Sequence, residues 1–252
     1  MRTISEAVIL MAGNGSRLRT SGQTLPKPLV PVCGRPLISH TVESLRKIGV
    51  RTIHVVLGAN ADTLLIALRA LVPQRMHLNP IRNPHWQKQN GVSVLSAKGQ
   101  VTAPFLLTMG DHLFDWEIFE RLLKASDPAR LNLAVDRKIS SIFDLADATK
   151  VQARGRQLEA IGKDLKRYDA IDTGLFLCPN DIFSYLHQAQ YEGDCSLTDG
   201  VRAMARDEKV DAIDIGDAWW QDIDTPEMLD FAEIQLSRRS SHVPTQEGVA
   251  HV

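Results

Sequence analysis

The glycines and basic side chains that follow an apolar segment near the amino end have the composition of a phosphate-binding turn. Residues 7–20 read AVILMAGNGSRLRT, an apolar run that ends in Gly13, Gly15, Ser16 and Arg17. A glycine-rich turn at the end of a buried strand exposes backbone N–H groups that can hold a phosphate chain, and arginine adds positive charge. The plainer interpretation is a tight surface turn with solvated arginines.

A lysine held between two prolines favours the phosphate interpretation. The sequence continues with Pro26-Lys27-Pro28, and because proline fixes its own φ and restricts the residue before it, Lys27 has a preset direction. Arg17 and Lys27 together could neutralise a triphosphate, whereas the alternative is two solvated loop cations. Two common glycine loops do not fit: Leu18 replaces the third glycine of a dinucleotide-binding loop, and no Gly-Lys-Ser/Thr follows as in a P-loop.

Two acidic sites lie far from these cations in the sequence. Asp111 comes directly after the apolar segment FLLTMG, at a strand end, and burying an unpaired carboxylate there would cost roughly several kcal/mol. In WWQDIDTPE, Asp222 and Asp224 are two residues apart, and alternate residues of a strand share one face. Because Mg²⁺ prefers carboxylate and phosphate oxygens, all three aspartates are candidate metal ligands. The alternative for Asp224 is a helix N-cap ahead of Pro226.

Short β-branched segments alternate with amphipathic ones and would position these residues. This alternation predicts an α/β fold, a Rossmann-like, mostly parallel sheet flanked by helices, with ligands at the carboxyl ends of the strands. Helices are expected from Pro36 to Ile48, and from Asn60 to a point before Pro73. Residues 149–163 predict a hairpin that turns at 154–156, which makes the sheet mixed. The expected strands are Ala7–Met11, Thr52–Leu57, Phe105–Met109, Leu131–Val135, Ile171–Leu177 and Val210–Ile215.

Length and composition favour a globular protein and exclude several classes. The chain has 252 residues, of which 44% are hydrophobic and 23% charged, enough for a full core without staples. A net charge of −1 argues against a general nucleic-acid binder and against membrane attachment by charge. Three widely spaced cysteines without a CxxC pair favour a reducing, cytoplasmic location. The apolar run over 7–12 is too short for membrane insertion.

The turn and the lysine together resemble a motif of the nucleotidyltransferases that activate sugar phosphates. That family carries a strand ending in Leu-Ala-Ala-Gly-x-Gly-x-Arg-Leu, followed by Pro-Lys-Pro. This chain departs from it at Met11, where the family usually has alanine and where a larger side chain could reshape the base pocket. Further blocks, which extend over residues 6–230, are similar in sequence and order to those of inositol-1-phosphate cytidylyltransferases. They are NGVSVLSAKG, LLTMGDHLF, FDLADATKV, AIGKDL, DAIDTGLF and WWQDIDTPE.

The resemblance implies a fold, an activity and partners. The fold would be that of the nucleotide-diphospho-sugar (GT-A type) transferases, and the activity would be transfer of CMP from CTP to a phosphorylated polyol, above all inositol 1-phosphate, with Mg²⁺. The related family is often fused to a membrane-bound phospholipid synthase, whose apolar spans this chain lacks. We therefore expect a freestanding enzyme whose product passes to a separate transferase, and a homo-oligomer stays open. One domain is expected over 1–236, divided into a nucleotide-binding part (about 1–115) and an acceptor-binding part (about 116–236), with a mobile tail over 237–252.

The resemblance also implies a role for individual residues. The nucleotide-binding residues would be Ala12, Gly13, Gly15, Ser16, Arg17, Lys27, Asn90, Gly91, Ser93 and Asp111. The acceptor-binding residues would be Asp136, Lys150, Lys163, Asp172, Thr173 and Gly174. The metal ligands would be Asp111 with Asp222 or Asp224, and the catalytic side chains would be Arg17, Lys27, Asp111 and Lys163. As alternatives, Asn90-Gly91 is a good turn dipeptide and DTGLF could start a core strand.

In this scheme the acceptor phosphate is itself the nucleophile. Its second pKa is near 6, so it is mostly a dianion at neutral pH and needs no general base. It would attack the α-phosphorus in line, with Mg²⁺ between Asp111 and the α-phosphate, while Arg17 and Lys27 stabilise the departing pyrophosphate and Lys163 guides the nucleophile. His112 would have a supporting or structural role.

Three other functions stay open. The first is nucleotidyl transfer to another sugar, cyclitol or choline phosphate from CTP, UTP, GTP or dTTP, although a choline site needs an aromatic cage and only 6% of the residues are aromatic. A GT-A-type glycosyltransferase could use Asp222 and Asp224 for its metal, but it has no need of Arg17 and Lys27 at a pyrophosphate leaving group. A silent nucleotide sensor on the same fold would need neither acidic site.

Overall fold

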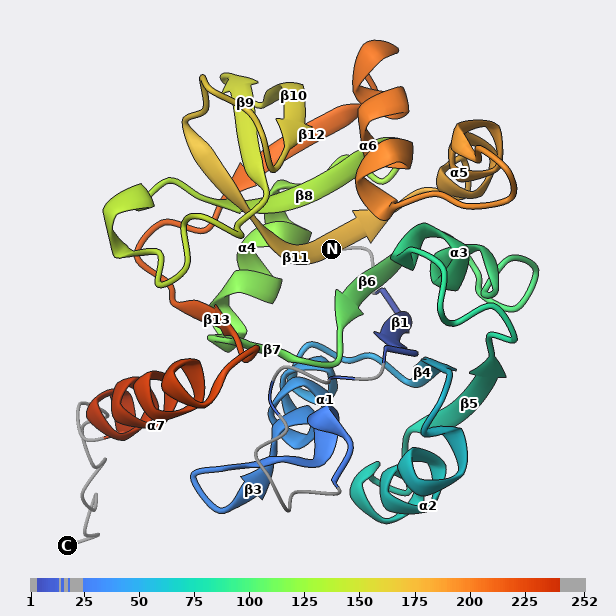
Figure 1. Cartoon of the computed structure of the whole chain (residues 1–252), viewed down its shortest axis with the longest axis vertical. Helices are drawn as coiled ribbons and strands as arrows, with labels where there is room; N and C mark the ends of the chain where they lie inside the picture. The colour runs from blue at the N-terminus through green and yellow to red at the C-terminus, as the bar shows by residue number, and fades with distance from the viewer. Residues whose placement is uncertain (1–3, 14, 16–17, 19–24, 241–252) are drawn as a thin grey trace, which may run out of the picture.

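The computed structural model describes residues 4–13, 15, 18 and 25–240. Within them, one large sheet carries helices on both faces and two short ribbons lie beside it (Figure 1). The strands of the large sheet are β1 (Glu6–Met11), β4 (Thr52–Leu57), β5 (His77–Arg82), β6 (Phe105–Met109), β8 (Leu131–Asp136), β9 (Lys150–Arg154), β10 (Gln157–Gly162), β11 (Ala170–Cys178) and β12 (Val210–Asp214). The ribbons pair β2 (Pro31–Val32) with β3 (Arg35–Pro36), and β7 (His112–Phe114) with β13 (Trp220–Asp222). The helices are α1 (Leu37–Lys47), α2 (Ala61–Leu71), α3 (Asn90–Leu95), α4 (Trp116–Ala125), α5 (Ile182–Ala189), α6 (Leu197–Arg206) and α7 (Pro226–Ser240), with 3₁₀ turns at Lys27–Leu29 and Ile139–Ser141.

The large sheet is mixed, as predicted, and its order is β5-β4-β1-β6-β11-β8-β12-β10-β9. Strands β5, β4, β1 and β6 run parallel, whereas β11 is antiparallel to both β6 and β8. Leu10 on β1 pairs with Met109 on β6. The residues that follow these two neighbouring strands, Gly13 and Asp111, therefore leave the sheet at the same edge.

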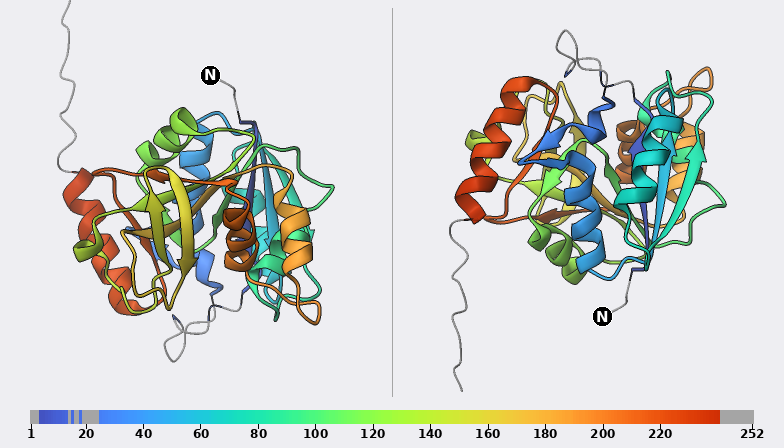
Figure 2. Two further views of the ribbon diagram at one scale, coloured as in Figure 1. Left: turned by 90° about the horizontal axis from the view of Figure 1, so that it is seen from above. Right: turned by 90° about the horizontal axis from the view of Figure 1, so that it is seen from below.

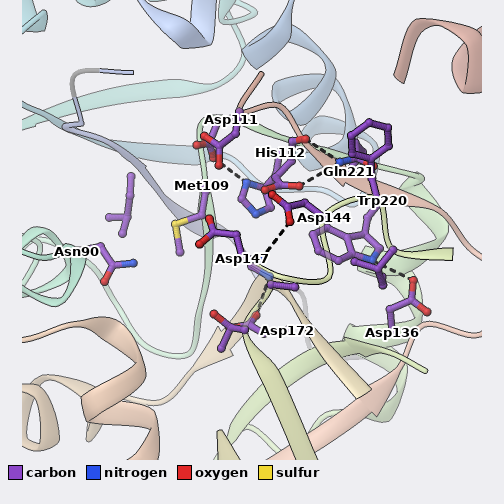
Figure 3. Close-up of a pocket in the computed structure, with 18 of the residues that line it drawn as sticks. Asn90, Met109, Asp111, His112, Asp136, Asp144, Asp147, Asp172, Trp220 and Gln221 are labelled. Atoms are coloured by element: carbon purple, nitrogen blue, oxygen red, sulfur yellow. Dashed lines mark hydrogen bonds and ion pairs between the residues drawn. The ribbon is translucent and has the colours of Figure 1, made fainter. Parts of the chain in front are cut away.

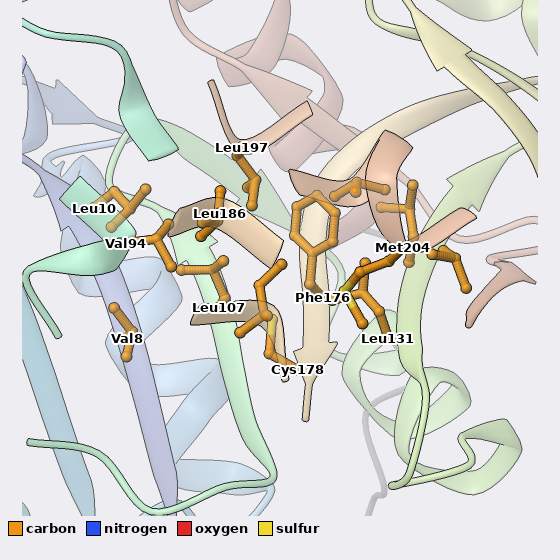
Figure 4. Packing of buried hydrophobic residues seen from close by; sticks show 14 of the residues in the cluster. Val8, Leu10, Val94, Leu107, Leu131, Phe176, Cys178, Leu186, Leu197 and Met204 are labelled. Atoms are coloured by element: carbon orange, nitrogen blue, oxygen red, sulfur yellow. The ribbon is translucent and has the colours of Figure 1, made fainter. Parts of the chain in front are cut away.

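Alternation along the strands divides the core into two layers. On β1, Val8 and Leu10 join the cluster that packs on α3, α5 and α6, and Figure 4 shows part of this cluster. Ile9 and Met11 point to the opposite face and pack on α1, α2 and α4. Figure 2 shows the orange helices α5 and α6 across the sheet from the blue helix α1 and the green helix α4. Both faces are thus buried, which explains why β1 is apolar at nearly every position.

All six expected strands form, each within one residue of its expected ends, and the hairpin forms from β9 and β10. Strand β5 was missed because its sequence, HLNPIR, contains a proline and few β-branched residues. It occupies the edge of the sheet, which is where a strand tolerates a residue without a backbone N–H. Asn90-Gly91 opens α3 and does not form an isolated turn.

The last helix extends past the boundary expected from the sequence. The tail was predicted to begin at residue 237, but α7 continues to Ser240. Its last turn is held by Arg239, whose Nη1 donates to Asp115 Oδ2 at 2.6 Å. Residues 241–252 lie outside the described part of the chain. Among the described helices, none has the length and apolar character needed to cross a membrane.

Candidate active site

Two hollows meet at the carboxyl ends of β1 and β6. The larger has a volume of about 720 Å³ and is lined from β1, β6, β11, the loop after β8, and α7 (Figure 3). The smaller has a volume of about 310 Å³ and is lined in part by Gly15, Lys27 and Gly110. The residues that line both hollows are Leu10, Gly13, Asp111 and Asp224. The two carboxylates therefore stand at the boundary between the hollows.

Lys27 joins these two carboxylates. Its Nζ donates to Asp111 Oδ2 at 2.6 Å and to Asp224 Oδ1 at 2.5 Å, and its side chain is only 9% exposed. Gly15 lies directly beside the lysine stem, since a Cβ at Gly15 would be 2.7 Å from the Lys27 Cβ. The sequence prediction that the amino-terminal cation and the two acidic segments converge is confirmed for Lys27, Asp111 and Asp224. Ser16 and Arg17, predicted beside them, lie outside the described residues.

The second oxygen of Asp111 is bound by His112. The Nδ1 of His112 donates to Asp111 Oδ1 at 2.7 Å, as Figure 3 shows. The imidazole stacks on Phe114 and on Trp220, with ring centroids 5.9 and 6.0 Å apart. Its Nε2 lies against Gly174, where an added Cβ would approach to 2.7 Å. His112 thus fixes Asp111 and also contacts β11.

The pKa values of these groups follow from burial and mutual charge. Burial opposes ionisation of Asp111, but Lys27 and His112 outweigh it and hold the pKa of this carboxyl well below its usual range. Burial likewise lowers the pKa values of Lys27 and His112, but the neighbouring carboxylates leave both above their usual values. Burial, together with the negative charges of Asp224 and Asp111, raises the pKa of Asp222. Asp222 therefore holds its proton to a higher pH than an exposed aspartate does.

This donor set suits an oxygen-seeking divalent cation without forming a complete metal site. Mg²⁺ takes few protein carboxylates and completes its shell with phosphate oxygens and water. Among the described residues, no group of three or more His, Cys, Asp or Glu side chains is arranged to hold a metal ion. In this structure the Lys27 ammonium provides the positive charge between Asp111 and Asp224.

The predicted base-reading residues lie at one end of the larger hollow. Ala12, Gly13, Asn90 and Ser93 all line it. The backbone N–H of Leu197 donates to Asn90 Oδ1 at 2.8 Å, so the Asn90 amide nitrogen is left as a donor, and Figure 3 shows it on the cavity side.

Two residues near the base end lie elsewhere than the sequence suggested. Gly91 packs against Cys195, whose backbone oxygen would be 2.6 Å from an added Cβ, and is not among the residues that line the hollow. Met11 is buried beside Gly110 and lines the smaller hollow, whereas the other residues predicted near the base line the larger one.

The predicted acceptor residues divide into two groups. Asp136, Lys163, Asp172 and Gly174 line the opposite end of the larger hollow. Lys150 and Thr173 do not: both are buried, the Lys150 Nζ donates to the Ala146 carbonyl at 3.0 Å, and the Thr173 hydroxyl donates to the Ala134 carbonyl at 2.8 Å. Their side chains are used by the fold, because neighbouring residues of a strand alternate between its faces.

Burial raises the pKa of Asp172 to about 6, although the Gly174 N–H, which donates to Asp172 Oδ1 at 2.7 Å, lowers it. Asp172 is therefore a carboxyl that changes charge near neutral pH. A second carboxylate of the acceptor end, Asp136, is also hydrogen-bonded: the Trp220 Nε1 donates to Asp136 Oδ2 at 3.0 Å. The acceptor end thus presents carboxylates that are already oriented by neighbours, as recognition of hydroxyl groups requires.

Several lining residues were missed by sequence reasoning. Asp147 forms an ion pair with Lys163, and the Asp147 N–H donates to Asp144 Oδ1. Both lie in FDLADATKV, a block that carried the resemblance but gave no individual role to them. An aromatic group also lines the acceptor end, and it consists of Phe143, Trp219, Trp220 and Phe231. Its members come from segments distant in sequence, so no local motif reveals them.

Comparison with known proteins gives the following matches. The model of the MobA-like NTP transferase domain matches residues 7–163. The bifunctional IPC transferase and DIPP synthase of Aquifex aeolicus is 30% identical over 233 residues, which are 92% of this chain and 52% of that protein. Its namesake from Rubrobacter xylanophilus is 35% identical over 229 residues, 90% of this chain and 51% of that protein. The chain therefore spans about half the length of the curated relatives it matches.

Solved structures of nucleotidyltransferases have a similar fold. The inositol-1-phosphate CTP transferase from T. maritima matches with a TM-score of 0.84 and 25% identity, covering 96% of this chain and 99% of that one. A UDP-glucose pyrophosphorylase complexed with UDP-glucose matches with a TM-score of 0.77 and 17% identity, covering 94% and 99%, which supports the fold alone. The fold is thus the predicted one, that of the nucleotide-diphospho-sugar transferases.

Proposed function

Because this chain belongs to the MobA-like NTP transferase family, we propose that it is a cytidylyltransferase that transfers CMP from CTP to inositol 1-phosphate and releases pyrophosphate. The names of the bifunctional relatives and of the T. maritima enzyme support this substrate pair. The observation that carries the reaction type is the position of Lys27 between Asp111 and Asp224, at the boundary of two hollows.

The two hollows suit the parts of the reaction. The smaller one, beside Gly13, Gly15 and Lys27, would hold the phosphates that leave as pyrophosphate. The larger one would hold cytidine at the Asn90 end and the acceptor at the Asp172 end. The α-phosphate would then lie near Asp111, which lines both. A glycosyltransferase has no pyrophosphate leaving group, so it gives no role to a lysine in this position.

The chain's own residues account for most of the catalysis. An oxygen of the acceptor phosphate forms a bond to the α-phosphorus while the bond from that phosphorus to the β-phosphate oxygen breaks, and pyrophosphate leaves. Lys27, together with Arg17 as implied by the sequence, stabilises the negative charge on the leaving group. Lys163, which exchanges its partner Asp147 for the incoming phosphate, guides the nucleophile. No side chain has to remove a proton, because the acceptor is already a dianion.

A magnesium ion fits the acidic cluster and belongs to the proposal. Asp111 with Asp222 or Asp224 would hold it, and the ion supplies charge neutralisation and polarises the phosphoryl group. At the acceptor end, Asp136, Asp144 and Asp172 would accept hydrogen bonds from polyol hydroxyls. The aromatic side chains nearby would cover the apolar faces of the ring.

The test is a pyrophosphate-release assay with CTP, UTP, GTP and dTTP, each paired with inositol 1-phosphate, glucose 1-phosphate and phosphocholine. We expect release with CTP and inositol 1-phosphate to exceed every other pair by at least about tenfold in kcat/KM, or roughly 1.4 kcal/mol. If another pair of substrates were preferred, the proposed reaction type would stand and the proposed substrates would be replaced. If no nucleoside triphosphate yielded pyrophosphate and a nucleotide sugar yielded UDP or GDP, the chain would be a glycosyltransferase.

A further inference from the structure

Both oxygens of the carboxylate that is best placed to hold a metal ion are already engaged. Asp111 Oδ2 accepts from Lys27 Nζ at 2.6 Å, and Asp111 Oδ1 accepts from His112 Nδ1 at 2.7 Å. Asp224 Oδ1 accepts from the same lysine at 2.5 Å. A carboxylate oxygen can bind a cation and keep one hydrogen bond, but a cation placed between Asp111 and Asp224 meets the Lys27 ammonium, which already occupies that position. The contacts of Lys27 and His112 show which of these two donors can move.

His112 lines the larger hollow but is held by several contacts. Its ring stacks on Phe114 and Trp220, its Nε2 abuts Gly174, and its backbone is held in the β7–β13 ribbon opposite Asp222. Moving the imidazole would disturb β7, β11 and β13 together. We therefore assign His112 to the part of the site that stays in place.

Lys27 reaches the two carboxylates through a flexible four-carbon stem. Its backbone is held in the 3₁₀ turn Lys27–Leu29, but its four-carbon side chain can rotate its ammonium without moving that turn. The smaller hollow, which Gly13 and Gly15 also line, is directly accessible to it. An anion in that hollow would offer the ammonium a partner of equal or greater charge than the two carboxylates. Lys27 therefore has an alternative position, and His112 does not.

From these contacts we propose that Lys27 occupies the cation position of the free protein and leaves it only when the phosphates of the nucleotide enter the smaller hollow. The inference rests on the proposed nucleotidyl transfer. The divalent cation then binds where the ammonium was, between Asp111 and Asp224, and Lys27 follows the phosphates that will leave. In the nucleotide-free protein the lysine excludes the metal. Metal and nucleotide consequently bind with positive linkage: each raises the affinity for the other by the same factor.

The presence of Lys27 between Asp111 and Asp224 also stabilises the nucleotide-free site. Without Lys27 or a metal ion, Asp111 and Asp224 would lose the cation that they share in a largely buried site, which is unfavourable. Lys27 supplies this positive charge until substrate arrives, and the site thus exchanges one positive charge for another.

The test measures Mn²⁺ binding to the full chain without nucleotide, by the loss of the electron paramagnetic resonance signal of the free ion. We expect weak binding by the wild-type protein and at least tenfold tighter binding by Lys27→Met, which keeps the length of the stem and removes the ammonium. The matched control is Lys163→Met, which removes the same charge from the adjoining larger hollow and leaves the Lys27 contacts with Asp111 and Asp224 in place. It should change Mn²⁺ affinity less than twofold. Equal affinity in the wild type and Lys27→Met would overturn the proposal.

A second measurement uses the wild-type protein alone, because Lys27→Met removes the cation that Asp111 and Asp224 share and thereby lowers the stability of the fold. Mn²⁺ binding is titrated with and without a CTP analogue whose α,β-bridging oxygen is replaced by methylene, and the analogue's own Mn²⁺ affinity is subtracted. At least tenfold tighter binding with the analogue supports the exchange, whereas equal affinity contradicts it. Neither measurement requires turnover, so both can be interpreted even if the proposed acceptor or base is wrong. If the protein transfers CMP to inositol 1-phosphate but its nucleotide-free form binds Mn²⁺ tightly, the exchange is refuted and the proposed function stands.

Discussion

The ammonium of Lys27 lies 2.6 Å from Asp111 Oδ2, although the two residues are 84 positions apart in the sequence. The contact joins the turn that follows β1 to the end of β6, the two neighbouring parallel strands at the ligand edge of the sheet. Because Asp224 shares the same ammonium, three chain segments meet at one charged point.

Gly110 is required because of Met11. A Cβ at position 110 would lie 2.3 Å from Met11 Cγ, inside van der Waals contact. Gly110→Ala should therefore shift Asp111, lower kcat by about tenfold or more and destabilise the fold by roughly 1–3 kcal/mol. In the double variant with Met11→Ala, which carries the alanine of the related family, part of the lost activity should return. Purely additive losses in this double-mutant cycle would show that the two side chains do not collide.

Gly174 provides the space for the His112 ring. Its φ is +76° and an added Cβ would lie 2.7 Å from His112 Nε2. Gly174→Ala should reduce kcat by roughly one to two orders of magnitude, because His112 would have to release Asp111. Gly155→Ala is the control: it has a φ of +62° in the β9–β10 turn and no neighbour within 4 Å. If both variants lost the same activity, backbone strain and not the imidazole contact would be the cause.

Asn90 should read the base through its amide nitrogen. The Leu197 N–H occupies its oxygen, so Asn90→Asp keeps that contact and removes the donor toward the cavity. We expect kcat/KM for CTP to fall about 10- to 100-fold with the unfolding midpoint unchanged, since a buried acceptor on the base loses its donor. Asn90→Leu should in addition lower the midpoint, because Leu197 then loses its acceptor. Unchanged CTP kinetics in Asn90→Asp would remove this residue from base recognition.

Asp172 should lower stability at neutral pH. Its pKa is about 6 in the folded protein, above the ordinary value of 3.8, so the folded state binds the proton more tightly than the unfolded state. The resulting stabilisation is complete below about pH 4 and is lost as the pH rises through 6. Asp172→Asn should therefore raise the free energy of unfolding at pH 7.5 by roughly 2–3 kcal/mol and change it little at pH 4. Urea unfolding at both pH values checks this, and equal effects at the two would contradict it.

The same substitution should weaken acceptor binding. If Asp172 accepts hydrogen bonds from the polyol, Asp172→Asn raises the KM for the acceptor about tenfold or more while the KM for CTP stays unchanged. A gain in stability together with a loss of acceptor affinity is the pattern expected of a residue kept for function. A variant that gained stability and kept its acceptor KM would leave Asp172 without a role in recognition.

A feature was predictable from the sequence where its cause is local. The buried strands were predictable, because β-branched runs bounded by turn residues can be identified without knowing their distant partners. Asp111 was predictable because it directly follows a strand at the ligand edge of the sheet, and Lys27 because it lies between two prolines in a motif of the related family. Lys150 and Thr173, predicted to bind the acceptor, are buried and do not line the larger hollow, and a motif shows neither the face of the sheet nor the local bulge of β11 that decides this. His112 received only a supporting role, because its ring partners Phe114, Trp220 and Gly174 meet it only in the folded chain.

The most direct test of the account is ³¹P nuclear magnetic resonance of the full chain with CTP, inositol 1-phosphate and Mg²⁺, with Asp111→Asn run in parallel. The wild type should consume both substrates and yield pyrophosphate and a new diphosphate diester in equal amounts, and Asp111→Asn should form them at least 100-fold more slowly while its circular dichroism spectrum remains that of the folded protein. If no diester forms with any acceptor phosphate, or if Asp111→Asn makes it at the wild-type rate, nucleotidyl transfer at the Lys27–Asp111 site is contradicted.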